Sequence, residues 1–232
     1  MVALFCIEAE HNTITDMKIL KFFAAVVLSA FLLPTVSAQG ILPEIPVPAG
    51  GWAELSVNVG AGLEFDEVVT EGYPFGSFEV GGGLAFPLMP DIPVYARANL
   101  GLVYTTDRGI DGPSDTYSYY TSLRPSADVG YLLTIYKSIK LFLYPGIYTR
   151  FNLYGRDVYR PDSGIVRARN RMKDVDEDDR MLPLQFGFQV GAELEVERIL
   201  VGMRMSSDLT HLYAGGDPTR TATVALKVGY KF

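Results

Sequence analysis

The sequence has almost no thiol or imidazole chemistry. Its 232 residues include one cysteine, Cys6, and two histidines, His11 and His211. Cys6 and His11 both precede a segment with the features of a signal peptide, so the processed chain is expected to have no thiol and one histidine. Disulfide frameworks and thiol catalysis are therefore excluded for the processed chain, which fits an exported protein that makes no use of an oxidising compartment.

Downstream of residue 38, long apolar runs are also missing, although 48% of the chain is hydrophobic. No segment there is long enough to cross a bilayer as a helix. Excess basic charge is missing as well, since the net charge is −7, and we predict no nucleic-acid partner. The apolar residues occur instead at every second position, which is the period of a β-strand.

Residues 1–38 are predicted to be a leader that is removed before folding. Residues 17–21 form a short basic region, residues 22–33 an apolar core, and residues 36–38 the small side chains that signal peptidase requires. We expect cleavage before Gln39.

Met17 is predicted to be the true start, because residues 1–16 carry three acidic side chains where a basic region is needed. Residues 39–51 are predicted to be a periplasmic segment. Residues 52–232 then form one domain, which the following features identify as a barrel.

Eight amphipathic segments follow one another from residue 52 onward. The last one shows the pattern most clearly, because from Thr221 to Phe232 one face is fully apolar and the other carries Lys227 and Lys231. Each segment reaches the roughly 9–11 residues that a tilted strand needs to cross a bilayer.

The connections between these segments alternate in length. Residues 87–91, 134–138 and 197–198 form short turns. The longer connections are residues 66–76, 107–115, 155–181 and 214–219. Short periplasmic turns with long external loops are typical of outer-membrane barrels.

We therefore predict an all-β fold, an eight-stranded antiparallel up-and-down transmembrane β-barrel in the bacterial outer membrane with both termini in the periplasm. Aromatic residues at both ends of the strands are expected to form two belts at the headgroup level, with Trp52 in the periplasmic belt. A soluble lipocalin-like barrel or a β-sandwich is the alternative, since either would bury the same apolar face. Charge on the polar face favours the membrane barrel.

Ten charged residues on the polar faces are predicted to form a charge network in the lumen: Glu54, Glu79, Arg97, Arg124, Asp128, Lys140, Arg150, Glu193, Arg204 and Asp208. Side chains essentially fill an eight-stranded barrel, and buried charges of opposite sign must pair. The network is expected to plug the lumen. The alternative is a narrow conduction path.

The connection at residues 155–181 begins with basic side chains and continues into the acidic run 174–179. We expect a solvated loop or an extended hairpin whose two halves pair electrostatically. Alternatively, its arginines contact lipopolysaccharide phosphates, because guanidinium groups bind phosphate well. These arginines are Arg156, Arg160, Arg167, Arg169 and Arg171. A third reading is a divalent ion at Asp174-x-Asp176-x-Asp178, although Asp179 and Gln185 depart from a calcium loop. We predict no metal site and no cofactor.

His211 raises the question of catalysis, because Ser207 and Asp208 lie close to it in the sequence. A serine hydrolase needs the hydroxyl, the base and the acid together. On a strand Ser207 and His211 would share one face and Asp208 the other. We therefore predict no catalytic residues.

The leader, the eight amphipathic segments, the Asp208-Leu209-Thr210 stretch and the ending Val228-Gly229-Tyr230-Lys231-Phe232 resemble the PorT-like outer-membrane β-barrel family common in Bacteroidetes. The resemblance implies insertion by the barrel-assembly machinery, with Val228, Tyr230 and Phe232 as its recognition signal. We expect a structural or surface-interaction protein in contact with outer-membrane lipid. The alternatives are an accessory subunit of a secretion or envelope-assembly complex, with an envelope protein partner, and a lipid-modifying enzyme.

Overall fold

The computed structural model describes residues 50–66, 72–109, 115–136, 139–160, 167–176, 180–215 and 219–232. The predicted leader and the predicted periplasmic segment up to residue 49 lie outside these ranges. Within them the strands are β1 (Trp52–Asp66), β2 (Gly72–Pro87), β3 (Val94–Gly109), β4 (Asp115–Tyr136), β5 (Ile139–Arg160), β6 (Arg167–Asn170), β7 (Leu184–Val196), β8 (Ile199–Asp208) and β9 (Thr219–Lys231). No helix in these ranges is long and apolar enough to span a bilayer.

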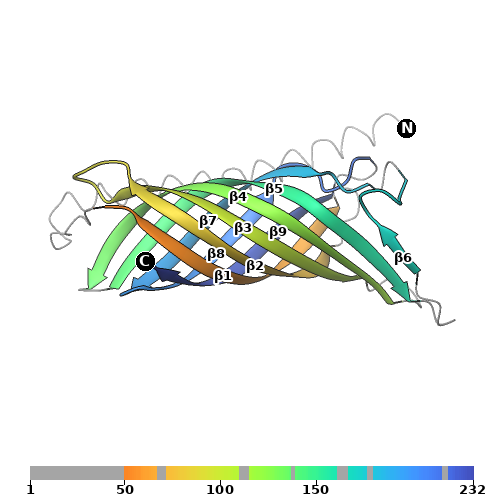
Figure 1. The fold of residues 1–232 in the computed structure, drawn as a ribbon, viewed down its shortest axis with the longest axis horizontal. Coiled ribbons are helices and arrows are strands. Elements are labelled where there is room, and N and C mark those ends of the chain that lie inside the picture. The colour runs from red at the N-terminus through yellow and green to blue at the C-terminus, as the bar shows by residue number, and fades with distance from the viewer. Residues whose placement is uncertain are drawn as a thin grey trace, which may run out of the picture. The chain divides into compact units, whose positions relative to one another are not determined.

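The strands close on themselves into a barrel (Figure 1). From β1 to β5 each strand pairs antiparallel with the next, β5 pairs with β7, and β7, β8 and β9 pair in turn, while β1 pairs with β9 to complete the ring. Among the described strands, β6 alone stands outside the ring, because it pairs only with the outer part of β5. The ring is therefore eight-stranded, antiparallel and up-and-down, and the predicted fold is confirmed.

The apolar face of the sheet points outward. Leu226 and Ile147 are 65% and 67% exposed, whereas Asp128 and Gln189 on the inner face are buried. A soluble barrel or sandwich has the reverse arrangement, so that alternative is wrong. Closure leaves no free edge within the ring, and an apolar exterior around a polar interior is the architecture of an outer-membrane β-barrel.

Outward aromatic side chains lie near both ends of the strands. Phe86, Tyr230 and Phe232 lie near the short turns and are more than 40% exposed. A second group near the long connections is exposed to a similar extent: Phe65, Phe78 and Tyr104. Trp52 does not belong to either group. It is buried at the start of β1, because it is two residues before the inward Glu54 and so shares its face.

β4 and β5 are longer than the sequence predicts. Each has 22 residues, about twice what a bilayer crossing needs, so their paired outer parts extend past the other strands. β6 adds a third strand to this extension through the pairs Arg156↔Asn170 and Asp157↔Arg169. The sequence shows no clear alternation at residues 155–160 and 167–170, because the extension lies beyond the lipid-facing part of the strands and its outward face does not need to be apolar.

Inside the barrel, tyrosine rings lie over glycines on the neighbouring strand. Tyr144 pairs with Gly191 and Tyr148 with Gly187 across β5 and β7. A Cβ atom at residue 187 would lie 2.6 Å from the Ser207 carbonyl oxygen and would overlap the Tyr148 ring. The glycines thus make room for large side chains in a narrow lumen.

Candidate functional site

Arg97 on β3 lies at the centre of the best-connected group in the lumen. Its guanidinium is 3.1 Å from Asp128 Oδ2, 2.8 Å from Glu193 Oε2 and 3.4 Å from Glu54 Oε1. It also stacks over the rings of Tyr144 and Phe142, at 4.2 and 4.9 Å from their centroids. The Arg97 and acidic side chains are at most 2% exposed, so their charges compensate one another without water.

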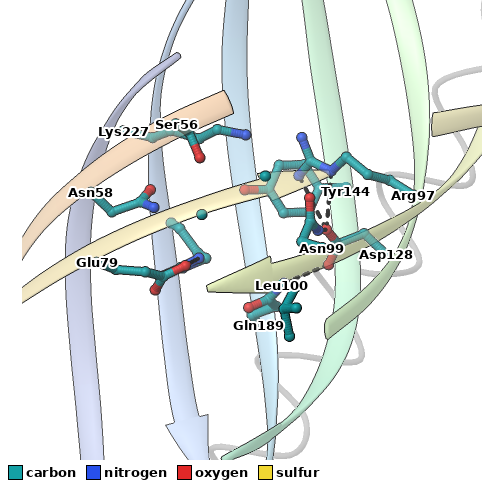
Figure 2. Close-up of a pocket in the computed structure, with 13 residues that line it drawn as sticks. Ser56, Asn58, Glu79, Arg97, Asn99, Leu100, Asp128, Tyr144, Gln189 and Lys227 are labelled. Atoms are coloured by element: carbon teal, nitrogen blue, oxygen red, sulfur yellow. Dashed lines mark hydrogen bonds and ion pairs between the residues drawn. The ribbon is translucent and has the colours of Figure 1, made fainter. Parts of the chain in front are cut away.

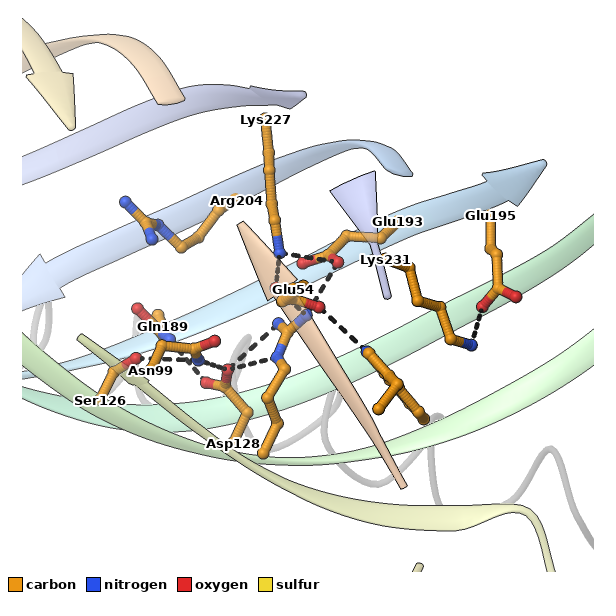
Figure 3. A network of polar contacts seen from close by, with 12 residues as sticks. Glu54, Asn99, Ser126, Asp128, Gln189, Glu193, Glu195, Arg204, Lys227 and Lys231 are labelled. Carbon is orange, nitrogen blue, oxygen red and sulfur yellow. Dashed lines mark hydrogen bonds and ion pairs between the residues drawn. The ribbon is translucent and has the colours of Figure 1, made fainter. Parts of the chain in front are cut away.

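Lys227 on β9 adds a second cation to this group (Figure 3). Its Nζ contacts Glu54 Oε1 and lies 3.0 Å from Glu193 Oε2, so two carboxylates are shared between Arg97 and Lys227. Arg97, Lys227, Glu54, Asp128 and Glu193 are called the Arg97 cluster below. It draws on strands β1, β3, β4, β7 and β9 and therefore ties together most of the circumference of the barrel.

A second group, the Glu79 cluster, consists of Glu79, Arg124 and Arg204. Glu79 Oε2 lies 2.5 Å from Arg204 Nη2 and 3.3 Å from Arg124 Nη1. Arg124 also donates to Gln189 Oε1 at 2.9 Å and stacks on Tyr148, 3.9 Å from its ring centroid. Here one carboxylate serves two arginines.

Asp208 forms a third group next to the Glu79 cluster. It accepts hydrogen bonds from the Tyr148 hydroxyl at 2.5 Å and from Thr221, and its Oδ2 lies 3.6 Å from Arg150 Nη1. The side chain is 2% exposed. All of its partners lie in the lumen.

Two apolar clusters lie beyond these charges, one at each end. The inner plug, near the short turns, consists of Trp52, Ala85, Tyr95, Leu132, Phe142 and Tyr144. The outer plug consists of Tyr120, Met181 and Leu212, with Met172 and Tyr213 packed against them. The outer plug comes largely from the long connections, which fold back over the mouth of the barrel.

A polar network holds the chain over the outer mouth in place. Arg171 Nε lies 2.5 Å from Asp157 Oδ1, and its Nη1 donates to the Tyr213 hydroxyl. Ser118 Oγ donates to the same Asp157 carboxylate at 2.8 Å. Burial raises the pKa of the Tyr213 hydroxyl well above its usual value, so Tyr213 remains a neutral acceptor for Arg171.

The cavity between the Arg97 and Glu79 clusters is very small (Figure 2). Its volume is about 10 Å³, enough for at most a single water molecule. Asn58, Asn99, Gln189, Asp128 and Arg204 contribute to its lining. A space of this size has no room for an organic substrate or cofactor.

All ten residues predicted for the lumen network point into the barrel. Eight are buried and two, Lys140 and Arg204, are partly exposed. The prediction omitted five inward residues. Glu195, Lys227 and Lys231 form ion pairs, Gln189 donates to Asp128, and Glu64 is buried. The period of two placed Lys227 and Lys231 on the polar face, and that signal was sufficient to include them.

The predicted lipopolysaccharide contacts do not form one group. Arg156 and Arg169 are exposed on the β5–β6 extension. Arg171 turns toward the mouth of the barrel, where it pairs with Asp157 and donates to the Tyr213 hydroxyl. The side chains of Arg160 and Arg167 lie outside the described residues. Arg171 thus pairs with an acid of β5 rather than with the acidic run.

The structure brings together no metal-ligating group of three or more acidic, histidine or cysteine side chains in the ranges it describes. Asp174 and Asp176 are exposed, and Asp178 is outside those ranges. Ser207 and Asp208 lie on opposite faces of β8, as predicted, and the partners of Asp208 are Tyr148, Thr221 and Arg150. His211 is partly exposed beyond the end of β8.

No family model and no curated protein matches this chain. Among solved structures it is similar to the attachment invasion locus protein Ail of Yersinia pestis, with 12% identity, a TM-score of 0.46, and coverage of 79% of this chain and 99% of Ail. Neisserial surface protein A gives 12% identity and a TM-score of 0.46, covering 78% and 97%. The outer membrane enzyme PagL gives 17% identity and a TM-score of 0.42, covering 76% and 98%.

Proposed function

We propose that this protein is an outer-membrane barrel with a sealed lumen, which anchors a surface structure built from its long connections. The observation that carries the proposal is the filling of the lumen. The Arg97 and Glu79 clusters occupy its middle, and an apolar plug lies at each end. Transport of solutes through the barrel would require both plugs and the paired charges between them to move.

The extension above the outer mouth is the part of the barrel best placed to meet partners. It consists of the outer parts of β4 and β5 together with β6, and it rests on the outer plug through Asp157, Arg171 and Tyr213. Exposed side chains on it include Arg156 and Arg169. These two arginines support contact with anionic groups such as lipopolysaccharide phosphates.

Membership of the PorT-like family, insertion by the barrel-assembly machinery and the lack of an enzymatic role stay predictions. In the proposed recognition signal, Val228 and Tyr230 point outward on β9 and Phe232 directly follows the strand, and each of the three residues is at least 43% exposed. That position supports recognition of these side chains by the barrel-assembly machinery from the outer, lipid-facing side of the strand.

Single-channel recording of the purified protein in a planar bilayer tests the sealed lumen. We expect no stable conductance, because an ion could pass only by breaking the buried ion pairs of the lumen, which lie between the two apolar plugs. Heat-modifiable mobility on gels serves as the control for a folded barrel. Stable, reproducible conductance steps from protein that passes this control would contradict the proposal.

Labelling of intact cells tests the orientation, in which the short turns and both termini lie in the periplasm. The full chain carrying Cys6→Ser is expressed with either Arg169→Cys or Glu197→Cys, both at exposed positions. We expect a membrane-impermeant maleimide to label residue 169 on whole cells and residue 197 only after the outer membrane is opened. The opposite pattern would invert the proposed orientation.

A further inference from the structure

The turn between β2 and β3 is unusually apolar for the short-turn end of the barrel. Leu88, Met89 and Ile92 are 53%, 49% and 41% exposed. The turn between β7 and β8 differs, since it consists of the exposed, charged pair Glu197 and Arg198. Two turns at the same end of the barrel therefore present opposite chemistry.

The apolar side chains of this turn continue the outer face of the strands. Leu84 and Phe86 point outward on β2 and are 52% and 55% exposed. Leu88 follows directly after the end of β2 and Ile92 lies two residues before the start of β3, and both are exposed. Exposed apolar side chains thus continue from the outer face of the strands into the turn.

The backbone of the turn is suited to a water-poor environment. Pro90 and Pro93 lie among its six residues, 88–93, and Pro87 directly precedes them, and prolines have no N–H group to satisfy. The Leu88 N–H donates to the Val94 carbonyl at 2.8 Å, and the Pro93 carbonyl accepts from the Leu132 N–H at 2.8 Å. Irregular backbone is normally excluded from lipid because its polar groups lack partners, and these features reduce that cost.

We propose that the turn at residues 88–93 lies in the periplasmic leaflet of the outer membrane and binds phospholipid, with Leu88, Met89 and Ile92 at the boundary of headgroups and acyl chains. Asp91, which is exposed at the tip, then lies at the headgroup level. The inference rests on the proposed function, because it requires that the apolar exterior faces lipid. Its argument for lipid is the continuity of the turn with that exterior.

Depth-dependent fluorescence quenching tests this placement. Single cysteines replace Leu88, Glu197 or Leu226 in the full chain carrying Cys6→Ser, each is labelled with an environment-sensitive fluorophore, and the protein is reconstituted into phosphatidylcholine vesicles. We expect the label at residue 88 to lose most of its fluorescence to a lipid with a nitroxide near its headgroup. The label at residue 197 should instead be quenched by aqueous iodide.

The label at residue 226 separates the two possible failures, because Leu226 faces outward at 65% exposure on β9. If nitroxide lipids fail to quench residue 226, the exterior does not face lipid and the proposed function itself is overturned. If they quench residue 226 but residue 88 responds to iodide like residue 197, the turn faces water and only the present inference is overturned. In that case the turn would be a surface for a periplasmic protein.

Discussion

Replacement of Arg97 by methionine is expected to lower the free energy of unfolding by about 3–5 kcal/mol, the usual cost of removing one partner from a buried ion pair. Methionine keeps most of the volume but no charge, which leaves Glu54, Asp128 and Glu193 with Lys227 as their remaining cation in the Arg97 cluster. Denaturant unfolding in lipid vesicles, followed by the fluorescence of Trp52, measures the effect. Trp52 is the single tryptophan of the chain and packs in the inner plug next to this cluster.

The matched control for Arg97→Met is Lys140→Met. Lys140 also pairs with a glutamate, Glu195, at 3.1 Å, but its side chain is 24% exposed at the rim of the barrel. Water screens such a pair, so we expect a loss of at most about 1 kcal/mol. Equal losses for the two variants would show that the Arg97 cluster is no more important for stability than a rim pair.

Replacement of Glu79 by glutamine is expected to have a cost of similar size, about 3–5 kcal/mol, for the opposite reason. The change leaves Arg124 and Arg204 together in the lumen without the carboxylate that they share. The nearby carboxylate of Asp208 is already paired with Arg150. The outer half of the lumen therefore gains an uncompensated positive charge from Arg124 and Arg204. The same unfolding measurement applies.

A second substitution provides the control for Glu79→Gln. In the double variant Glu79→Gln/Arg204→Met, one cation is removed together with the anion, and we expect part of the lost stability to return. If the double variant is as unstable as the sum of the two single variants, the Glu79–Arg204 contact contributes nothing specific to the stability of the barrel.

Alternation in the sequence was sufficient to predict the ring of strands and the direction of nearly every side chain in it. Arg97 and Asp128 were placed in the lumen and Leu226 and Ile147 outside, because the period of two is imposed by the strand itself. Trp52 is the exception, because an amphipathic ring favours the headgroup level but its position two residues before Glu54 turns it into the lumen.

Which residues pair inside the lumen could not be predicted in the same way. Arg97 contacts Glu193 from a strand 96 residues later in the chain, and Arg204 contacts Glu79 across 125 residues. These contacts depend on the stagger between strands, which the lengths of the connections do not specify. The β5–β6 pairing was predicted only as one of two alternatives, an extended hairpin, because these residues do not alternate in polarity as the lipid-facing strands do.

The pairing of β1 with β9 has a consequence for biogenesis. Glu54 lies opposite Lys231, so β9 joins β1 in one ladder although some 170 residues separate them in the chain. A nascent or truncated chain therefore keeps two open β-edges, which are templates for aggregation until closure occurs. Because contacts so distant in sequence form slowly, a variant that lacks β9 should leave both edges open and be a protease substrate rather than a smaller barrel.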